Sequence, residues 1–192
     1  MVRRESLAER RKRKASVDDP SVVLEAAARF LEARSRSVSE VRRRLTGAGY
    51  RADLVEGAIE RLTELGMLDD DAFARAWVES RDRARPRGER AIREELRLKG
   101  IERAIIDPIL ADRRDGAIDG GDGTDDVART PDRMAAARLL ARHARALARV
   151  ADPRQRRQRA YALLARNGFD PETCREVAAT VDLTLEEAEP LD

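Results

Sequence analysis

The residues with the clearest chemical potential are basic side chains gathered between positions 81 and 99. Eight of them accompany only four acidic residues in that segment. They are Arg81, Arg83, Arg85, Arg87, Arg90, Arg93, Arg97 and Lys99. Because a guanidinium is planar and donates paired hydrogen bonds, an arginine cluster suits the recognition of carboxylates or phosphates. The segment is therefore predicted to bind an acidic surface or a phosphate-rich partner.

Ion pairing along helices is the alternative explanation for these charges. An arginine three or four positions from a glutamate can pair with it on a solvated helix face, and this accounts for about half of the basic side chains. It does not account for the run from Arg81 to Arg87, in which Asp82 is the only acidic residue. That run is the first candidate for an interaction surface, and its turn position predicts exposure.

Two further groups of arginines extend the candidate surface. On a helix, positions 90, 93 and 97 fall on one narrow stripe, away from the apolar positions 92 and 96. Near the C-terminus, Arg156 and Arg159 are candidates of the same kind, within a group that also holds Arg154, Arg157 and Arg166.

No catalytic constellation is recognisable. One cysteine and one histidine are too few for a disulfide framework or a Cys/His metal site. The chain lacks a glycine-rich phosphate loop, and its Asp/Gly-rich segment lacks the ligand spacing of an EF-hand. Asp69, Asp70 and Asp71 are interpreted as capping residues of a helix rather than as cation ligands. No catalytic residue, metal or cofactor is predicted, and the protein is not expected to be an enzyme.

Helices are predicted to position these side chains. Charged residues make up 40% of the chain and aromatic residues 3%, so the core must come mainly from helix-forming aliphatic residues. A leucine followed four positions later by a glycine recurs at Leu45/Gly49, Leu96/Gly100 and Leu164/Gly168. In each copy, apolar or small residues return five, six, nine and ten positions after the glycine. The pattern indicates three copies of one three-helix unit.

This register assigns the unusual single residues to the core. Cys174 stands where the other copies have Val55 and Ile106, so it is interpreted as a small core residue rather than a nucleophile. Trp77 lies on the same helical stripe as Phe73 and is also placed in the core.

The predicted fold is all-α, an elongated array of about nine helices in three tandem helix-turn-helix-like repeats. The boundaries are a basic N-terminal tail at 1–19, repeats at 20–66, 67–111 and 133–180, a flexible Asp/Gly-rich linker at 112–132 and an acidic tail at 181–192. The composition of the N-terminal tail favours a solvated disordered segment. The alternative is an arm that contacts phosphates or an acidic protein.

The strings LDDDAFARAWVESR and IREELRLKGI, joined by an Arg/Gly-containing turn, resemble the central segment of the RecX regulatory proteins. Those proteins are bacterial modulators of the RecA recombinase and consist of three tandem three-helix units. The resemblance implies a non-enzymatic protein that lies in the groove of the RecA–DNA filament. It implies an effect, with inhibition expected, on filament assembly, ATP hydrolysis and strand exchange in recombination, DNA repair and the SOS response.

A helix-turn-helix protein that reads DNA sequence is the alternative function. Its recognition helix should present basic and amide side chains to the bases. The third helix of the first repeat instead carries two arginines and four acidic residues. Sequence-specific binding is therefore less favoured, whereas weak, salt-dependent contact with DNA already inside a filament is compatible with the sequence. The chain has no signal-peptide core and no apolar run that could span a membrane, so a cytoplasmic location is expected. A monomer is expected as well.

Overall fold

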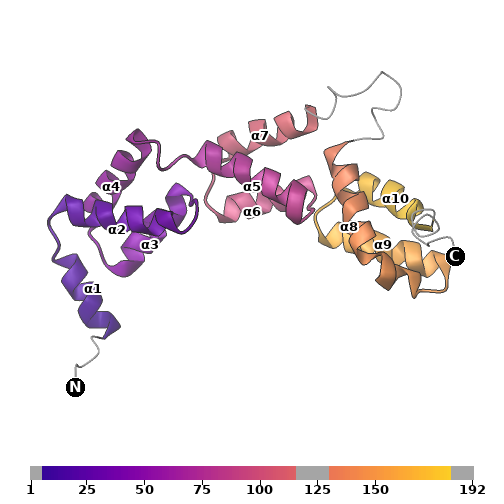
Figure 1. Cartoon of the computed structure of the whole chain (residues 1–192), viewed down its shortest axis with the longest axis horizontal. Helices are drawn as coiled ribbons and strands as arrows, with labels where there is room; N and C mark the ends of the chain where they lie inside the picture. Colours follow the sequence, from indigo (N-terminus) through magenta and orange to yellow (C-terminus); the bar gives the residue numbers. More distant parts are fainter. Residues whose placement is uncertain (1–5, 116–129, 183–192) are drawn as a thin grey trace. The chain divides into compact units, whose positions relative to one another are not determined.

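The computed structural model describes residues 6–115 and 130–182, which form helices and no strand (Figure 1). The helices are α1 (Leu7–Ala15), α2 (Pro20–Glu32), α3 (Val38–Ala48), α4 (Ala52–Glu64), α5 (Asp70–Ala84), α6 (Glu89–Leu98), α7 (Arg103–Asp115), α8 (Pro131–Ala148), α9 (Pro153–Arg166) and α10 (Pro171–Ala179). The all-helical prediction is confirmed for this part of the chain. None of these helices is both long and apolar enough to cross a membrane.

Helix α1 lies where the composition favoured disorder. Ser6 and Glu9 form a capping box, in which the Glu9 N–H donates to Ser6 Oγ (3.2 Å) and the Ser6 N–H donates to Glu9 Oε2 (2.7 Å). No residue of α1 is buried, but Lys14 Nζ lies 4.8 Å from the centre of the Tyr50 ring. A Cβ at Gly49 would lie 2.9 Å from the Arg11 carbonyl oxygen. Helix α1 thus contacts the end of α3, a tertiary contact that composition does not reveal.

The chain forms two compact units, and the first comprises residues up to Ala74 together with Leu98–Ile105. Its core lies among α2, α3 and α4. The buried residues of this core are Val23, Ala27, Val41, Leu45, Val55, Ala58, Ile59, Leu62 and Leu68. The apolar periodicity of these three helices therefore serves one shared core.

The second unit comprises Arg75–Arg97 and the chain from Ile106 onward. Its largest core lies among α8, α9 and α10 and includes Leu140, Leu164, Phe169 and Cys174. Cys174 is fully buried, which confirms its interpretation as a core residue. Burial raises the pKa of its thiol, and the charges of Asp170 and Asp132 raise the pKa further.

The ends of the predicted linker at 112–132 are helical. Helix α7 continues to Asp115, and α8 begins at Pro131 after the N-cap Thr130. Polar composition suggested flexibility there, but Arg113 Nη1 donates to Asp132 Oδ1 (2.6 Å) and joins the two helices. Residues 116–129 of the linker lie outside the described part of the chain.

The boundary predicted for the C-terminal tail, at 181–192, is also too early in the sequence. Val181 belongs to the core of the second unit, and Asp182 accepts a hydrogen bond from Arg156 Nη1 (2.6 Å). Residues 183–192 lie outside the described part.

In the first unit, the start of α3 is held by residues from beyond α4. The Val38 N–H donates to Asp70 Oδ1 (2.9 Å), and Ser37 Oγ donates to the Lys99 carbonyl (2.7 Å). The N-terminal N–H groups of a helix have no partner within it, so Asp70 supplies one of the acceptors that α3 lacks. Ser37 is fully buried by this arrangement.

The start of α6 is held in the same way within the second unit. The Glu89 N–H donates to Asp132 Oδ2 (3.0 Å), and the Gly88 N–H donates to the Asn167 carbonyl (3.1 Å). Both joints use the same two kinds of acceptor. One is an aspartate at the start of a later helix, Asp70 or Asp132, and the other is the carbonyl of the residue before a glycine, Lys99 or Asn167. The two joints are therefore equivalent.

Gly100 and Gly168 complete these joints. Both have a left-handed backbone, with φ of +80° and +83°, as the repeated glycine predicted. A Cβ on Gly100 would collide with the Ser39 side chain, and one on Gly168 would collide with Ala91. Both positions need glycine for its φ and for the close approach of a neighbouring helix.

Candidate functional site

Arg81 belongs to a half-buried cluster rather than to an exposed run. Its side chain is 15% exposed, and its Nε donates to Glu95 Oε2 (2.5 Å). Its guanidinium lies 4.2 Å from the centre of the Trp77 ring, and Trp77 Nε1 donates to the same Glu95 oxygen (2.8 Å). The expected exposure fails at this residue because Glu95, fourteen positions away on α6, supplies a carboxylate that the local sequence lacks.

Arg87 is also engaged. Its Nη1 donates to Asn167 Oδ1, and its Nε lies 3.7 Å from Glu95 Oε1. Since the neighbouring Gly88 N–H donates to the Asn167 carbonyl, Arg87 lies at the joint between the start of α6 and the end of α9. Its first role in the structure is to hold that joint.

Arg83, Arg85 and Arg90 match the expectation of an exposed surface. Arg83 pairs with Glu79 one turn earlier on α5, a solvated pair of small energetic value. In the part of the chain that the structure describes, the side chains of Arg85 and Arg90 are exposed and have no ion-pair partner. These three are the members of the segment best placed to meet a partner.

The remaining basic residues of the segment are paired within the chain. Arg93 pairs with Asp107 and Glu89, and the hydrogen bond that it donates to the Asp107 carboxylate raises the pKa of Arg93. Arg97 Nη2 lies 2.8 Å from Glu94 Oε1 on its own helix.

Lys99 Nζ lies 3.0 Å from Glu40 Oε1 within the first unit. Of the predicted stripe at positions 90, 93 and 97, Arg93 and Arg97 therefore pair with acidic residues of the chain itself, and Arg90 does not.

Arg156 and Arg159 have different roles. Arg156 Nε and Nη2 both donate to the Val150 carbonyl (3.1 and 3.0 Å), and its side chain is only 17% exposed. It therefore closes the turn between α8 and α9. Arg159 is exposed on α9 and remains a candidate for binding.

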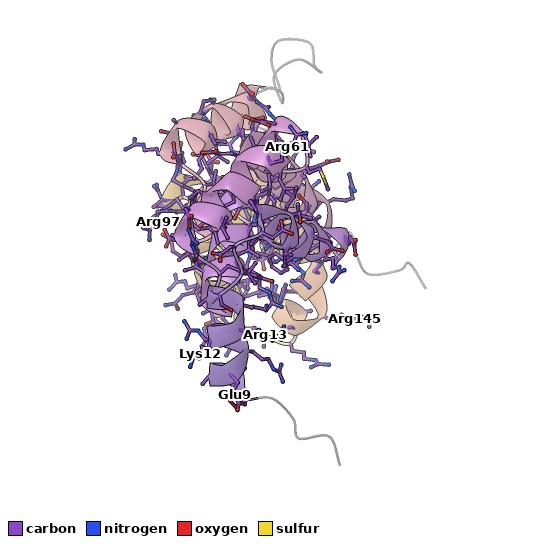
Figure 2. The ribbon with its side chains drawn as sticks, turned by 90° about the vertical axis from the view of Figure 1, so that its left-hand side faces the viewer. Glu9, Lys12, Arg13, Arg61, Arg97 and Arg145 are labelled. Atoms are coloured by element: carbon purple, nitrogen blue, oxygen red, sulfur yellow. The ribbon has the colours of Figure 1, made fainter. Side chains whose placement is uncertain are left out.

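Sequence reasoning missed two sets of arginines. Arg113 is 6% exposed and bonds to both Asp82 and Asp132, so it is a buried structural charge. Four exposed arginines also lie along α8 and at its C-cap, and their spacing of four, three and four residues could have been read from the sequence. They are Arg138, Arg142, Arg145 and Arg149; Figure 2 shows Arg145 extending from α8, and the exposed Arg61 and Arg97 elsewhere on the chain.

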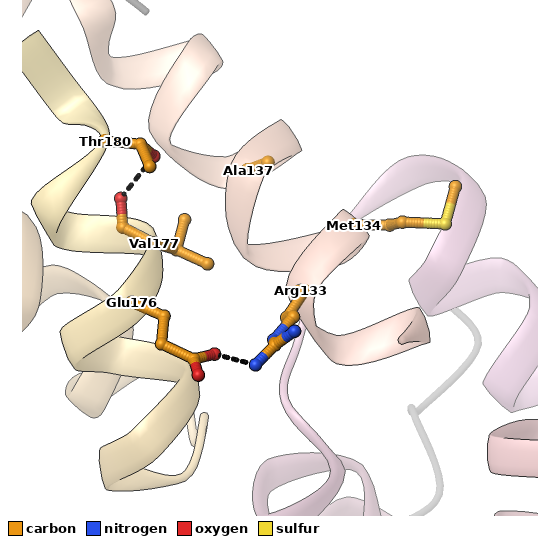
Figure 3. A pocket seen from close by; sticks show the side chains of 6 residues that line it. All are labelled: Arg133, Met134, Ala137, Glu176, Val177 and Thr180. Atoms are coloured by element: carbon orange, nitrogen blue, oxygen red, sulfur yellow. Dashed lines mark hydrogen bonds and ion pairs between the residues drawn. The ribbon is translucent and has the colours of Figure 1, made fainter. Parts of the chain in front are cut away.

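A groove between α8 and α10 was also not predicted (Figure 3). Its apolar lining comes from Met134, Ala137 and Val177, and its two charged side chains, Arg133 and Glu176, form an ion pair with each other. With those charges neutralised, the groove offers little chemistry for a polar ligand.

Comparison with known proteins identifies the family. A sequence model described as the first three-helix domain of RecX matches residues 24–62, and one for the second matches residues 69–109. "Regulatory protein RecX" of Mycolicibacterium vanbaalenii is 41% identical over 83 residues, covering 43% of this chain and 45% of that protein. The chain thus spans about half the length of the first relatives that it matches.

Longer matches support the same assignment. "Regulatory protein RecX" of Mycobacterium avium is 31% identical over 165 residues, covering 84% of this chain and 87% of that protein. The crystal structure of RecX from Lactobacillus salivarius shares the fold, with a TM-score of 0.68 at 20% identity over 86% of this chain and 98% of that one. The chain therefore belongs to the RecX family of regulatory proteins.

Proposed function

We propose that this protein binds the RecA–DNA filament and inhibits it, as a regulator that is not itself an enzyme. Its membership of the RecX family, over most of the chain, carries the proposal. The affected processes are filament assembly, ATP hydrolysis and strand exchange in recombination and DNA repair. The acting form is proposed to be a cytoplasmic monomer.

The exposed arginines of the second repeat form the proposed docking surface. Arg85 and Arg90 have no internal ion pair among the described residues, and Arg83 has only a solvated one. Binding a carboxylate or phosphate through them therefore breaks little that stabilises the fold. Arg81 and Arg87 are poor targets for a binding test, because reversing their charge would disrupt Glu95 and the joint at Asn167.

The test is the ATPase activity of RecA on single-stranded DNA, titrated with wild type and with the triple variant Arg83→Glu, Arg85→Glu, Arg90→Glu. Wild type should inhibit the ATPase. The variant should need at least tenfold more protein, which corresponds to about 1.4 kcal/mol of binding free energy. The difference should shrink as salt is raised, because exposed charges are screened.

A matched control reverses Arg29, Arg43 and Arg61, which are exposed and bond only to groups on their own helices. The control changes the charge equally, so a loss as large as that of the first variant would remove the docking surface from the mechanism. If saturating wild-type protein left the ATPase activity of RecA unchanged, the proposed inhibition of the filament would be overturned.

The third helix of the first repeat is a poor candidate for a DNA-reading helix. On α4, Glu56 accepts two hydrogen bonds from Arg42 (both 2.7 Å), and Asp53 accepts two from Arg51 (3.1 and 2.6 Å). Because these carboxylates occupy the two arginines, neither guanidinium is free to contact the phosphates that flank a base. Sequence-specific duplex binding therefore remains the weaker candidate.

A further inference from the structure

Helix α8 carries a row of arginines that the RecX assignment does not explain. Arg138, Arg142, Arg145 and Arg149 follow one another at intervals of four, three and four residues, and all four are exposed. At 3.6 residues per turn, these intervals place the side chains in one stripe along the helix. We call these four residues the α8 stripe.

The α8 stripe lies in a strongly basic part of the chain. Residues 133–168 contain ten arginines and a single acidic residue, Asp152. By contrast, the arginines on α5 and α6 have glutamates one turn away, as in Arg83–Glu79 and Arg97–Glu94. Helix α8 has only Asp132, which is committed to Arg113 and to the start of α6.

Internal acids leave most of this charge uncompensated. Arg133 pairs with Glu176, and Arg156 and Arg157 share Asp182. Within the described residues, no ion pair involves the α8 stripe, and Arg142 bonds only to a carbonyl, that of Ala84 (2.7 Å). That bond sets Arg142 beside the end of α5, where the exposed Arg85 follows. Concentrated, unpaired positive charge of this kind attracts a polyanion.

The surroundings of the α8 stripe favour nucleic acid over an acidic protein. From Ala137 to Arg149, the exposed residues are arginines, alanines and His143. A stable protein interface needs buried aromatic or large aliphatic anchors, and this face offers none. Alanines between the arginines instead allow an extended phosphate backbone to approach the helix closely.

The length of the α8 stripe also fits a phosphate backbone. Arg138 and Arg149 are eleven positions apart, a rise of about 16 Å on a helix, whereas a nucleic-acid strand places a phosphate about every 3.4 Å along the helix axis. Several phosphates can therefore meet the stripe at once. Base reading uses bidentate side chains at a groove floor, but these arginines lie in a single line with no exposed amide side chain between them.

We propose that the α8 stripe is a binding surface for the phosphate backbone of nucleic acid, used without reading base sequence. The interaction does not require RecA, so the proposal stands separately from the proposed function. Its affinity comes from counterion release and must fall steeply with salt.

The test is fluorescence anisotropy of a labelled single-stranded oligonucleotide of mixed sequence, titrated with the full chain, without RecA, across a salt series. The variant is Arg138→Gln, Arg145→Gln, Arg149→Gln, which removes three charges, keeps good helix formers and spares the Arg142–Ala84 bond. Affinity at low salt should fall at least tenfold. The slope of log Kobs against log salt should become shallower by about 2, since each phosphate contact on a single strand contributes about 0.7.

The matched control is Arg29→Gln, Arg43→Gln, Arg61→Gln, which removes the same charge elsewhere and should change the slope little. Circular dichroism should show equal helix content in all three proteins. An unchanged slope for the α8 variant, or an equal change for the control, would overturn the proposal. So would competition by polyglutamate as effective as that by unlabelled oligonucleotide, because the surface would then select carboxylates rather than phosphates.

Discussion

At the scale of single residues, burial separates the arginines that hold the fold from those that can meet a partner. Arg113 donates to Asp82 from Nε (2.9 Å) and Nη2 (2.8 Å) and to Asp132 from Nη1 (2.6 Å). Burial by itself would lower the pKa of Arg113, but the hydrogen bonds and charges of Asp82 and Asp132 outweigh it and raise the pKa. This guanidinium stays charged and is committed to the interior.

Replacing Arg113 is predicted to be costly. Arg113→Met leaves two carboxylates in a poorly solvated site without their cation, so the free energy of unfolding should fall by about 3 kcal/mol. Urea denaturation followed by circular dichroism measures the change. The neighbouring Arg114→Met is the control, because Arg114 is 55% exposed where it pairs with Glu89, and a loss below about 1 kcal/mol is expected. Similar losses for the two variants would contradict a structural role for Arg113.

At the scale of elements, the start of a helix can combine a local capping interaction with contacts from distant segments. The start of α3 has a capping box, with the Glu40 N–H donating to Ser37 Oγ (3.1 Å) and the Ser37 N–H donating to Glu40 Oε2 (3.3 Å). The same Glu40 carboxylate accepts from Lys99 Nζ and Arg34 Nη2, both at 3.0 Å. A local cap is thereby also a contact between distant segments of the first unit.

Stability should depend on pH through Glu40. Burial by itself would raise the pKa of Glu40, but the hydrogen bonds from Arg34, Lys99 and Ser37 lower it from 4.5 to about 2. A lowered folded-state pKa stabilises the fold above the unfolded-state value and loses that effect as pH falls through the folded-state value. The free energy of unfolding of wild type should exceed that of Glu40→Gln by about 2 kcal/mol at neutral pH. This difference should shrink as pH falls from 4.5 to 2.

Chemical denaturation across a pH series checks this prediction. Glu25→Gln is the control, because Glu25 forms an exposed pair with Arg29 one turn away, and an effect below about 0.5 kcal/mol is expected. A difference between wild type and Glu40→Gln that stays constant down to pH 2 would show that shape, not charge, matters at position 40.

At the scale of the whole molecule, one joint is used repeatedly. Gly100 packs against Ser39 in the first unit, and Gly168 packs against Ala91 in the second. At Gly49, the backbone of Arg11 in α1 occupies the corresponding place. Helix α1 therefore covers Gly49 as Ser39 covers Gly100 and Ala91 covers Gly168, and it acts there as a capping element does in other repeat proteins.

The joint should respond sharply to a single methyl group. Gly168→Ala would force alanine into a left-handed backbone conformation and would place its Cβ in collision with Ala91. The free energy of unfolding should therefore fall by about 2 kcal/mol or more. Gly57→Ala is the matched control, since Gly57 lies inside α4 with open space around its Cα, and it should stabilise by about 0.5–1 kcal/mol. Thermal unfolding would show shifts of opposite sign, whereas shifts of the same sign would refute this account of the joint.

Much of the architecture was readable in the amino-acid sequence. The repeated glycines follow from local backbone geometry and the core position of Cys174 follows from the apolar spacing after each glycine, and both predictions are confirmed. Helix α1 was not predicted, because its contact with Tyr50 and Gly49 comes from a segment more than thirty residues away.

The candidate surface was only partly readable, because the partner of an arginine need not be near it in the chain. The sequence determined that basic residues concentrate at 81–99 and 133–168, and local spacing identifies pairs such as Arg97–Glu94. The pairing of Arg81 with Glu95, and the hydrogen bond from Arg87 to Asn167, 80 positions away, depend on tertiary packing and were not predictable from local spacing. A long flexible side chain can meet any carboxylate or amide that folding brings within its reach, so the availability of each arginine is set by packing rather than by its neighbours in sequence.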